Sequence, residues 1–173
     1  MSDFRFTCAC CGKEIVGIPD IAFQWPHAYE VLSEEDRVAR ALIGSDLCVI
    51  DGRDYFIRAV CMIPVRGGDR QFGWGVWVSL SGENFGRYSG SFDDSDQSKL
   101  GPMFGWFSNL LPGYPDTLSL KTSVEPQDNN QRPLVWISDE HADHPLYREQ
   151  TQGIGLEDLS RLYARELCEN RKD

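Results

Sequence analysis

Two segments in the first half of the chain alternate apolar and polar residues, which is the pattern of β-strands with one buried face. Residues 55–65 carry the first alternation, and the apolar run 47–50 precedes them with Asp51-Gly52 in between. Because Asp-Gly tolerates the positive φ angles of a tight turn, this whole segment is predicted as a hairpin. Residues 72–80 carry the second alternation and are predicted as the next strand.

Apolar residues at helical spacing predict three helices. The first follows Ser33, whose hydroxyl is placed to cap it, and ends before Gly44. The second covers residues 101–111, where Pro102 suits the first turn. The third begins at Leu156, and we expect its apolar stripe to pack on the sheet.

The rest of the chain predicts shorter strands and loops. Residues 19–29 are rich in aromatic residues and proline, which predicts an extended packed segment. Short strands are predicted over residues 84–89, 117–124 and 133–137, and a polar loop over residues 143–153. Strands joined by short turns, with helices grouped separately, favour an α+β fold. We expect a largely antiparallel sheet, a few packed helices and an N-terminal cysteine knuckle.

The length of 173 residues is enough for one domain with a hydrophobic core and too short for two comfortable ones. We therefore expect residues 1–173 to form a single domain. Residues 6–19 within it are predicted as a zinc-knuckle-like segment.

Acidic residues outnumber basic ones, with 27 Asp plus Glu against 17 Lys plus Arg and a formal net charge of −10. Such a charge repels phosphate backbones and anionic lipids, so neither nucleic acid nor a membrane is an expected partner. An acidic surface suits a basic protein partner, although it is also ordinary for soluble bacterial-type proteins. The N-terminus lacks a continuous apolar run and no later stretch could span a bilayer, which predicts a cytoplasmic protein.

A Cys-x-x-Cys-Gly sequence near the N-terminus is the strongest chemical signal in the chain. Cys8 and Cys11 can converge on one metal ion in a tight turn, which Gly12 allows the backbone to make. A tetrahedral zinc site needs four ligands, and no second Cys-x-x-Cys follows. The other candidate ligands lie elsewhere in the sequence: Cys10, Cys48, Cys61, His141 and His144.

The same cysteines admit two other interpretations. In a reducing compartment they can be plain thiols, with no cofactor at all. A Cys-x-x-Cys pair can also cycle between dithiol and disulfide, although the strand and helix of a thioredoxin-type motif are absent around it. Cys48, Cys61 and Cys168 lie in apolar patterns and are expected in the core.

Two side chains of the predicted strands are candidates for ligand binding. Arg58 lies among apolar residues, where a buried guanidinium needs a carboxylate or a ligand. An ion pair with an acidic residue, or exposure at a sheet edge, is the simpler explanation. Trp77 stands between glycines and is either a core residue or a binding platform.

Catalysis has thinner support. The chain has three histidines, His27, His141 and His144, and no Gly-x-Ser-x-Gly elbow, so only an unspecified Cys/His pair stays open. If the chain is an enzyme, Arg58 would recognise a small anionic substrate and His144 would transfer protons. Together with Trp77 they would then line one pocket. Gln150, in the polar loop, is a further candidate for ligand binding.

Short segments along the chain also carry a family likeness: residues 6–12 with Pro19, 46–58, 73–80, Gly105-Trp106, Leu111-Pro112, Tyr114-Pro115, His144-Pro145-Leu146, Glu149-Gln150 and Gly153-Ile154. In order and spacing they resemble the bacterial domain of unknown function 2199 family, over nearly the whole chain. The resemblance implies a class of bacterial protein and no particular activity. Members of that family often place a His shortly after Cys-Gly, where this chain has Ile15. Either Cys10 replaces that ligand, or packing alone holds the turn.

The residues together predict a binding or interaction module, with structural zinc as one interpretation of the knuckle. The expected partner is a protein, and a basic surface on that partner would complement the net negative charge of this chain. The alternative is an enzyme that uses Cys/His or metal chemistry on a small anionic substrate.

Overall fold

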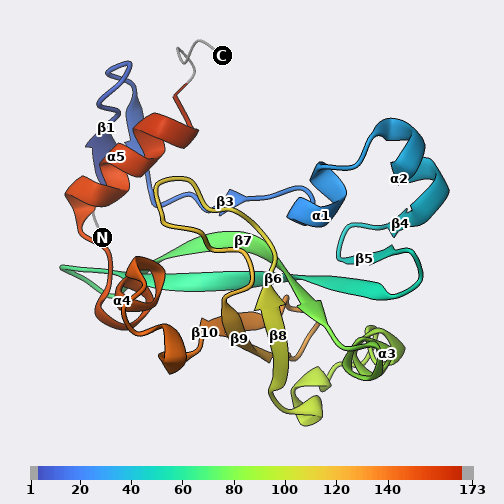
Figure 1. The fold of residues 1–173 in the computed structure, drawn as a ribbon. Helices are drawn as coiled ribbons and strands as arrows, with labels where there is room; N and C mark the ends of the chain where they lie inside the picture. The colour runs from blue at the N-terminus through green and yellow to red at the C-terminus, as the bar shows by residue number, and fades with distance from the viewer. Residues whose placement is uncertain (1–3, 169–173) are drawn as a thin grey trace.

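The computed structural model describes residues 4–168, in which five strands close into a barrel (Figure 1). The barrel strands are β6 (Asp54–Val65), β7 (Arg70–Leu80), β8 (Met103–Phe107), β9 (Lys121–Glu125) and β10 (Leu134–Ile137). They are hydrogen-bonded in that order, and β10 closes the ring by pairing with β6, where Leu134 lies opposite Val60. The fold is α+β as predicted, but its sheet is a closed barrel instead of a simple antiparallel sheet.

Shorter strands extend the sheet beside the barrel: β3 (Ile21–Ala22), β4 (Ala41–Ile43) and β5 (Leu47–Ile50). The predicted hairpin is confirmed as β5 and β6, and in its turn Asp51 and Gly52 have φ of 54° and 65°. β3 runs parallel to β7, and β10 runs parallel to β6. These parallel pairings join strands far apart in the sequence, so local alternation could not reveal them.

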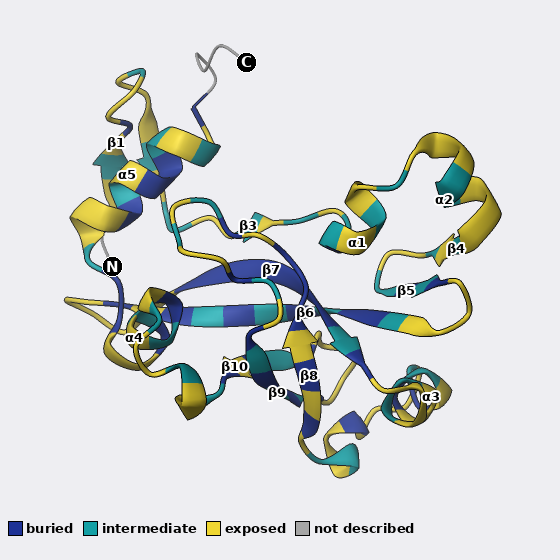
Figure 2. Ribbon diagram, viewed as in Figure 1, coloured by how far each residue is buried: buried dark blue, intermediate teal, exposed yellow. Residues whose placement is uncertain are grey.

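The barrel interior holds the main hydrophobic core, and β7 is buried along most of its length (Figure 2). Phe72, Trp74 and Val76 face this core, as the alternation of residues 72–80 predicted. A second, smaller cluster is built from Cys48, Ile50, Phe56 and Trp77. Trp77 has no exposed surface, so it is a core residue of this second cluster.

The helices of the described residues are α1 (His27–Glu30), α2 (Glu34–Arg40), α3 (Gly82–Gly90), α4 (Pro145–Gln152) and α5 (Leu156–Glu166), with 3-10 turns η1 (Gln97–Leu100) and η2 (Asp139–His141). The cap of α2 is confirmed, because the Asp36 N–H donates to the Ser33 hydroxyl oxygen at 3.1 Å. The helix stops at Arg40, since the next residues pair with β5 as strand β4. α5 is confirmed, and it buries Leu159, Leu162 and Tyr163. Among residues 4–168, no helix is both long and apolar enough to cross a bilayer.

In two segments the structure has a helix where we predicted a strand, or a strand where we predicted a helix. Residues 84–89, predicted as a strand, lie in α3, where Ser81 accepts a hydrogen bond from the N–H of Asn84 and caps the helix. Residues 101–111, predicted as a helix, contain strand β8, whose alternate residues are buried and exposed. Its apolar residues are so dense that helical and strand spacing both fit them, and pairing with β7 and β9 decides in favour of the strand.

Three other segments also differ from the prediction. The polar loop of residues 143–153 contains α4, whose first residue is Pro145. Residues 117–124 become strand only from Lys121, and the extended segment 19–29 contains β3 and the short helix α1. In the last two segments tertiary contacts override a weak local preference, whereas α4 begins with local signals, the His144 cap and Pro145.

A separate hairpin of β1 (Arg5–Thr7) and β2 (Glu14–Val16) lies beside α5 (Figure 1). The ring of Phe6 stacks on the ring of Tyr163, with centroids 5.1 Å apart. The Tyr163 hydroxyl donates to the carbonyl oxygen of Pro19 at 2.7 Å, and its ring meets Phe72 of β7 edge to face. One tyrosine of the last helix thus holds the first hairpin against the barrel.

We predict that Gly75→Ala destabilises the fold. A Cβ on Gly75 would lie 2.7 Å from the Cβ of Ala22, so β3 would have to move away from β7. Overpacking of this kind lowers the free energy of unfolding by about 1–3 kcal/mol. The matched control is Gly86→Ala in α3, which meets no atom within 4 Å and should stabilise the helix by up to about 1 kcal/mol. Urea unfolding followed by tryptophan fluorescence measures both, and an undiminished stability of Gly75→Ala would contradict the packing described.

Candidate functional site

The turn between β1 and β2 carries three cysteines within four residues, Cys8, Cys10 and Cys11. The Cys8 N–H donates to the carbonyl oxygen of Lys13 at 2.8 Å, and the Gly12 N–H donates to that of Cys8 at 2.9 Å. Gly12 has φ of 71°, a conformation that glycine adopts without strain. The Cys-x-x-Cys-Gly sequence therefore forms the tight turn that its residues predict.

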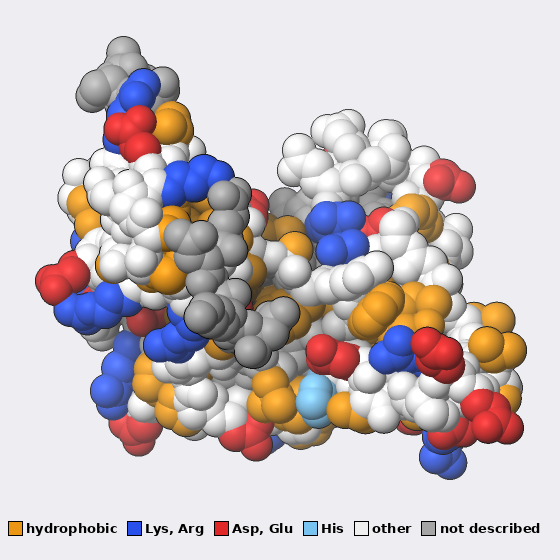
Figure 3. Space-filling model, turned by 90° about the horizontal axis from the view of Figure 1, so that it is seen from above, with side chains coloured by type: hydrophobic (Ala, Val, Ile, Leu, Met, Phe, Trp, Pro, Cys, Tyr) orange, Lys and Arg blue, Asp and Glu red, His pale blue; other side chains and the backbone are white. Residues whose placement is uncertain are grey.

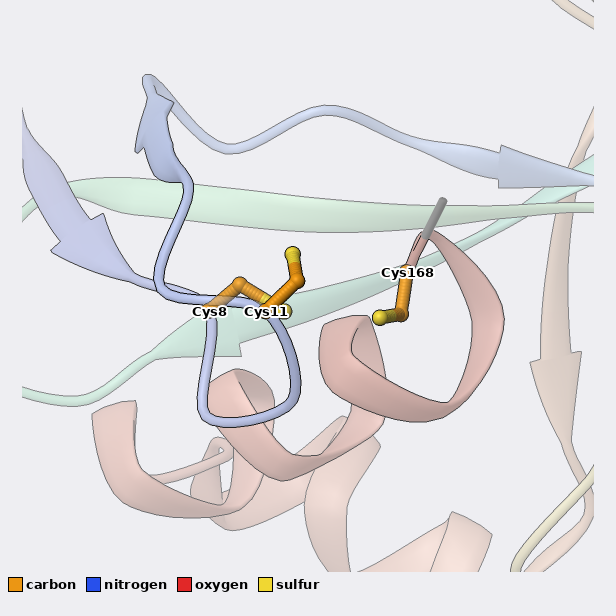
Figure 4. Close-up of side chains that lie close together, drawn as sticks. All are labelled: Cys8, Cys11 and Cys168. Carbon is orange, nitrogen blue, oxygen red and sulfur yellow. The ribbon is translucent and has the colours of Figure 1, made fainter. Parts of the chain in front are cut away.

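Cys8, Cys11 and Cys168 form a group of cysteines, whose sulfur atoms all lie within 4.8 Å of one another. Figure 4 shows Cys168 just beyond α5, with its sulfur directed toward the turn that carries Cys8 and Cys11. The stacking of Phe6 on Tyr163 brings these opposite ends of the chain together. Sequence spacing gives no sign of this approach, so Cys168 was not among the predicted ligands.

Cys168 has a second partner, because its sulfur is at disulfide distance from that of Cys10. The two Cα atoms are 6.3 Å apart, within the range that a disulfide bridges. A sulfur in a disulfide is no longer a thiolate, so Cys168 can serve the bond to Cys10 or the group with Cys8 and Cys11, but not both. We call Cys8, Cys10, Cys11 and Cys168 the cysteine cluster.

The donor set of the cysteine cluster fits zinc. Backbone hydrogen bonds from Cys11 and then Cys10 hold the pKa of the Cys8 thiol below its ordinary value, which favours the thiolate that a metal requires. Zinc accepts thiolate ligands in tetrahedral sites, whereas calcium and magnesium prefer oxygen. The sulfurs of Cys8, Cys11 and Cys168 lie close together, and Cys10 becomes a further thiol on the same turn when its disulfide is reduced.

The cysteine cluster does not include Cys48, which the sequence suggested as a ligand. Cys48 is buried in the second core cluster beside Trp77, and burial raises the pKa of its thiol to about 11. Cys61 is buried in the main core, where desolvation, and then the charge of Glu149, raises the pKa of its thiol to about 12. Both are core thiols, as their apolar patterns predicted. Cys168 is buried too, but against the knuckle.

Arg58 and Trp77 are brought together, because they lie opposite each other on β6 and β7. The guanidinium carbon is 5.8 Å from the indole centroid. Arg58 donates to the carbonyl oxygens of Phe23 at 3.1 Å and Ser45 at 3.2 Å, and Trp77 Nε1 donates to the same Phe23 oxygen at 3.3 Å. Burial, followed by the charge of Arg132, lowers the pKa of Arg58. These contacts brace the segment before α1 against the sheet.

His144 and Gln150 lie in and beside α4. His144 is the N-cap residue, since its Nδ1 accepts from a backbone N–H of the first turn at 3.1 Å, while its Nε2 lies 3.3 Å from the carbonyl oxygen of Pro115. Gln150 is buried, and its side-chain amide makes two hydrogen bonds to the backbone of β10. It accepts from the N–H of Ile137 and donates to the carbonyl oxygen of Val135, both at 2.8 Å. Both side chains therefore fasten α4 in place.

A half-buried carboxyl group that we did not anticipate from the sequence lies in the same helix. Glu149 accepts a short hydrogen bond from the Tyr114 hydroxyl, and burial raises the pKa of this carboxyl group. The pair lines a cleft of about 240 Å³ that Arg161 and Arg165 also border. Such perturbed groups occur at binding sites and in structural pairs alike. Tyr114 and Glu149 both lie in segments of the family likeness, which is the signal that could have drawn attention to them.

The outer side of β8, β9 and β10 exposes three aromatic side chains, Phe104, Trp106 and Trp136, which we call the aromatic face. Their exposed fractions are 51%, 41% and 38%. Ser123 of β9 lies between Phe104 and Trp136 in the register, and the rings of Phe104 and Trp106 meet edge to face. A shallow cavity of about 350 Å³ runs along Phe104 and Trp136. The helical interpretation of residues 101–111 hid the alternation that exposes Phe104 and Trp106.

The barrel and the cysteine turn define this molecule as an α+β protein. Its cysteine cluster lies where the first hairpin contacts the last helix and the residues just after that helix. A family model described as "Uncharacterized protein conserved in bacteria (DUF2199)" matches residues 7–154. The chain therefore belongs to this family, as the resemblance of its segments indicated. No curated protein and no solved structure matches the chain. The matched part contains Cys8, Cys10 and Cys11 and ends before Cys168.

We predict that iodoacetamide separates the cysteines of the reduced, folded protein into two classes. Cys10 is exposed and should react at the rate of an accessible thiol. Cys48 and Cys61 are buried and should stay unmodified until the protein unfolds. At about pH 8, a thiol with its pKa near 11 is roughly one part in a thousand thiolate, and burial blocks access as well. Peptide mass mapping over time measures the rates. Modification of Cys61 as fast as Cys10 would contradict the placement of Cys61 in the core.

Proposed function

We propose that this protein is a protein-binding module, in which the aromatic face contacts the partner and the cysteine cluster holds a structural zinc ion. The observation that carries the binding role is the joint exposure of Phe104, Trp106 and Trp136 on neighbouring strands. Grouped apolar side chains on a surface are typical of interaction sites. Tryptophan in particular supplies a large share of the binding energy at protein interfaces.

The aromatic face stands on a rigid support. The alternate residues of β8, Met103, Gly105 and Phe107, are buried in the barrel. A Cβ on Gly105 would lie 2.8 Å from the carbonyl oxygen of Ser79, so β8 and β7 pack closely. Side chains held on such strands are ordered before a partner arrives, which reduces the entropy lost on binding.

Charge indicates the chemistry of the partner. The exposed acidic residues Asp139 and Glu140 border the aromatic face, and Lys121 on that face is paired with Glu140 at 2.5 Å. The whole chain carries a formal charge of −10. On the side seen in Figure 3, acidic and basic side chains are interspersed, so the acidic excess does not dominate there. A partner segment with apolar and basic residues complements the aromatic face and its acidic border.

A zinc ion in the cysteine cluster would contribute to stability. Cys8 and Cys11 on the first turn, with Cys168 after the last helix, would tie the N-terminal hairpin to the C-terminal segment. Because such a site exists only in the folded chain, the free energy of metal binding adds to the free energy of unfolding. Zinc supplies no redox chemistry of its own and would act here as a cross-link.

The alternative, an enzyme with Arg58, Trp77 and His144 in one pocket, has weaker support. Arg58 and Trp77 share the carbonyl oxygen of Phe23, but the hydrogen bonds of His144 go to α4 and Pro115 instead. Trp77, His144 and the two terminal nitrogens of Arg58 already have partners within the protein, and only the buried Nε of Arg58 has no hydrogen-bond partner among the described residues of this group. The side chains of the aromatic face, in contrast, are accessible to a partner.

We predict near-stoichiometric zinc in untagged, reduced protein purified without chelator, measured by elemental analysis. The double variant Cys8→Ser with Cys11→Ser should lose the metal, because a structural zinc site does not persist on the remaining thiols. Cys48→Ala is the matched control and should keep it, since Cys48 lies in the second core cluster. A folded, metal-free wild-type protein that fails to take up added zinc would refute the zinc site.

We predict that a library of displayed random peptides selects apolar, basic sequences on the wild-type protein. The double variant Trp106→Ala with Trp136→Ala should fail to enrich them, since losing two hot-spot residues weakens binding by about 2 kcal/mol or more each. Val38→Ala, which alters an exposed apolar residue of α2, is the matched control and should select the same peptides as wild type. Circular dichroism confirms that the variants are folded. Selection of acidic peptides, or equal selection by the double variant, would count against the aromatic face.

A further inference from the structure

We infer that the cysteine cluster is a peroxide-sensitive metal site, in which oxidation of Cys10 and Cys168 to a disulfide expels the zinc ion. The inference rests on the zinc site proposed above and adds its regulation. It follows from the position of Cys168, which reaches both Cys10 and the pair of Cys8 and Cys11.

Removal of Cys168 leaves too few ligands. The sulfur atoms of Cys8, Cys11 and Cys168 lie within 4.8 Å of one another, and reduction of the disulfide would make Cys10 a further thiol on the same turn. When Cys10 and Cys168 join, only two thiols of the cluster remain, which is short of the four ligands that structural zinc sites use. Metal binding and the disulfide are therefore mutually exclusive states of the same four residues.

The two cysteines of the disulfide differ in access. Cys10 is exposed on the turn, whereas Cys168 is buried beside it with 8% of its surface exposed. A small oxidant therefore reaches Cys10 first. Cys168 is placed to react with the oxidised Cys10 and form the disulfide. Cys48 and Cys61 lie in the two hydrophobic cores and take no part.

The chemistry is balanced with hydrogen peroxide as the oxidant. The thiolate of Cys10 attacks one peroxide oxygen, the O–O bond breaks, and a sulfenic acid forms while hydroxide leaves and is protonated to water. The thiolate of Cys168, which would leave the zinc ion at this step, then attacks the sulfenic sulfur and forms the disulfide, while the expelled hydroxide takes a proton from solvent and becomes a second water. Two cysteines lose two electrons in total, and one peroxide gains them. A dithiol reductant reverses the step and restores the ligands.

The fold should survive this exchange. Zinc would join the N-terminal turn to the segment after α5, and the disulfide joins the same two segments by a covalent bond. The stacking of Phe6 on Tyr163 involves no cysteine, so we expect it in both states. Oxidised, zinc-free protein should therefore keep its thermal midpoint better than reduced protein stripped by a chelator.

The test uses zinc-loaded, full-length protein and hydrogen peroxide, with released zinc followed by a chromogenic chelator and disulfides by mass mapping. We expect one zinc per chain to be released as the Cys10–Cys168 disulfide appears, and to be bound again after dithiothreitol and fresh zinc. Cys10→Ser should slow the release by about tenfold or more, because the accessible thiolate and the disulfide are both lost. Cys48→Ala should behave as wild type.

Three outcomes would overturn the inference. In the first, zinc stays bound while the disulfide forms, which would show that Cys168 is not a ligand. In the second, the Cys10→Ser variant releases zinc at the wild-type rate, which would show that another oxidation expels the metal. Both results leave the zinc site itself standing. Reduced protein that binds no zinc would instead remove the proposed zinc site, and this inference with it.

Discussion

The pairing of β6 with β7 is the constraint on which the rest of the structure depends. It runs without interruption from Tyr55 opposite Leu80 to Val65 opposite Arg70. One face of this ribbon lines the main core and the other carries the second cluster around Trp77. β8 adds to β7 and β10 adds to β6, so the barrel closes only if this register is right. A slip by one residue would exchange the two faces and expose both cores.

The contacts of Tyr163 form a second organising point, where the two ends of the chain meet. Its ring lies between Phe6 of the first hairpin and Phe72 of β7, and its hydroxyl reaches Pro19. This packing places Cys168 beside the turn that carries Cys8, Cys10 and Cys11. The Cys10–Cys168 disulfide links the same two segments that this apolar contact brings together, and the proposed zinc ion would link them as well.

Most polar candidates of the sequence turned out to have partners within the fold. Arg58 bonds backbone carbonyl oxygens, Gln150 joins α4 to β10, and His144 caps α4. A single polar residue among apolar neighbours looks the same in a sequence whether it satisfies a backbone group or awaits a ligand. The aromatic face was overlooked for the opposite reason, because apolar residues in sequence are assumed to be buried.

The sequence by itself determined the features that depend on neighbouring residues. These are the hairpin of residues 47–65 with its Asp51-Gly52 turn, the Ser33 cap, helix α5, and the turn that joins Cys8 to Cys11. Only the tertiary structure decided that the sheet closes into a barrel, that β8 is a strand, and that Cys168 lies beside Cys8. The division has a physical basis: φ and ψ preferences and side-chain periodicity act over a few residues, whereas strand closure and the cysteine cluster require contacts between residues that only the packed core brings together.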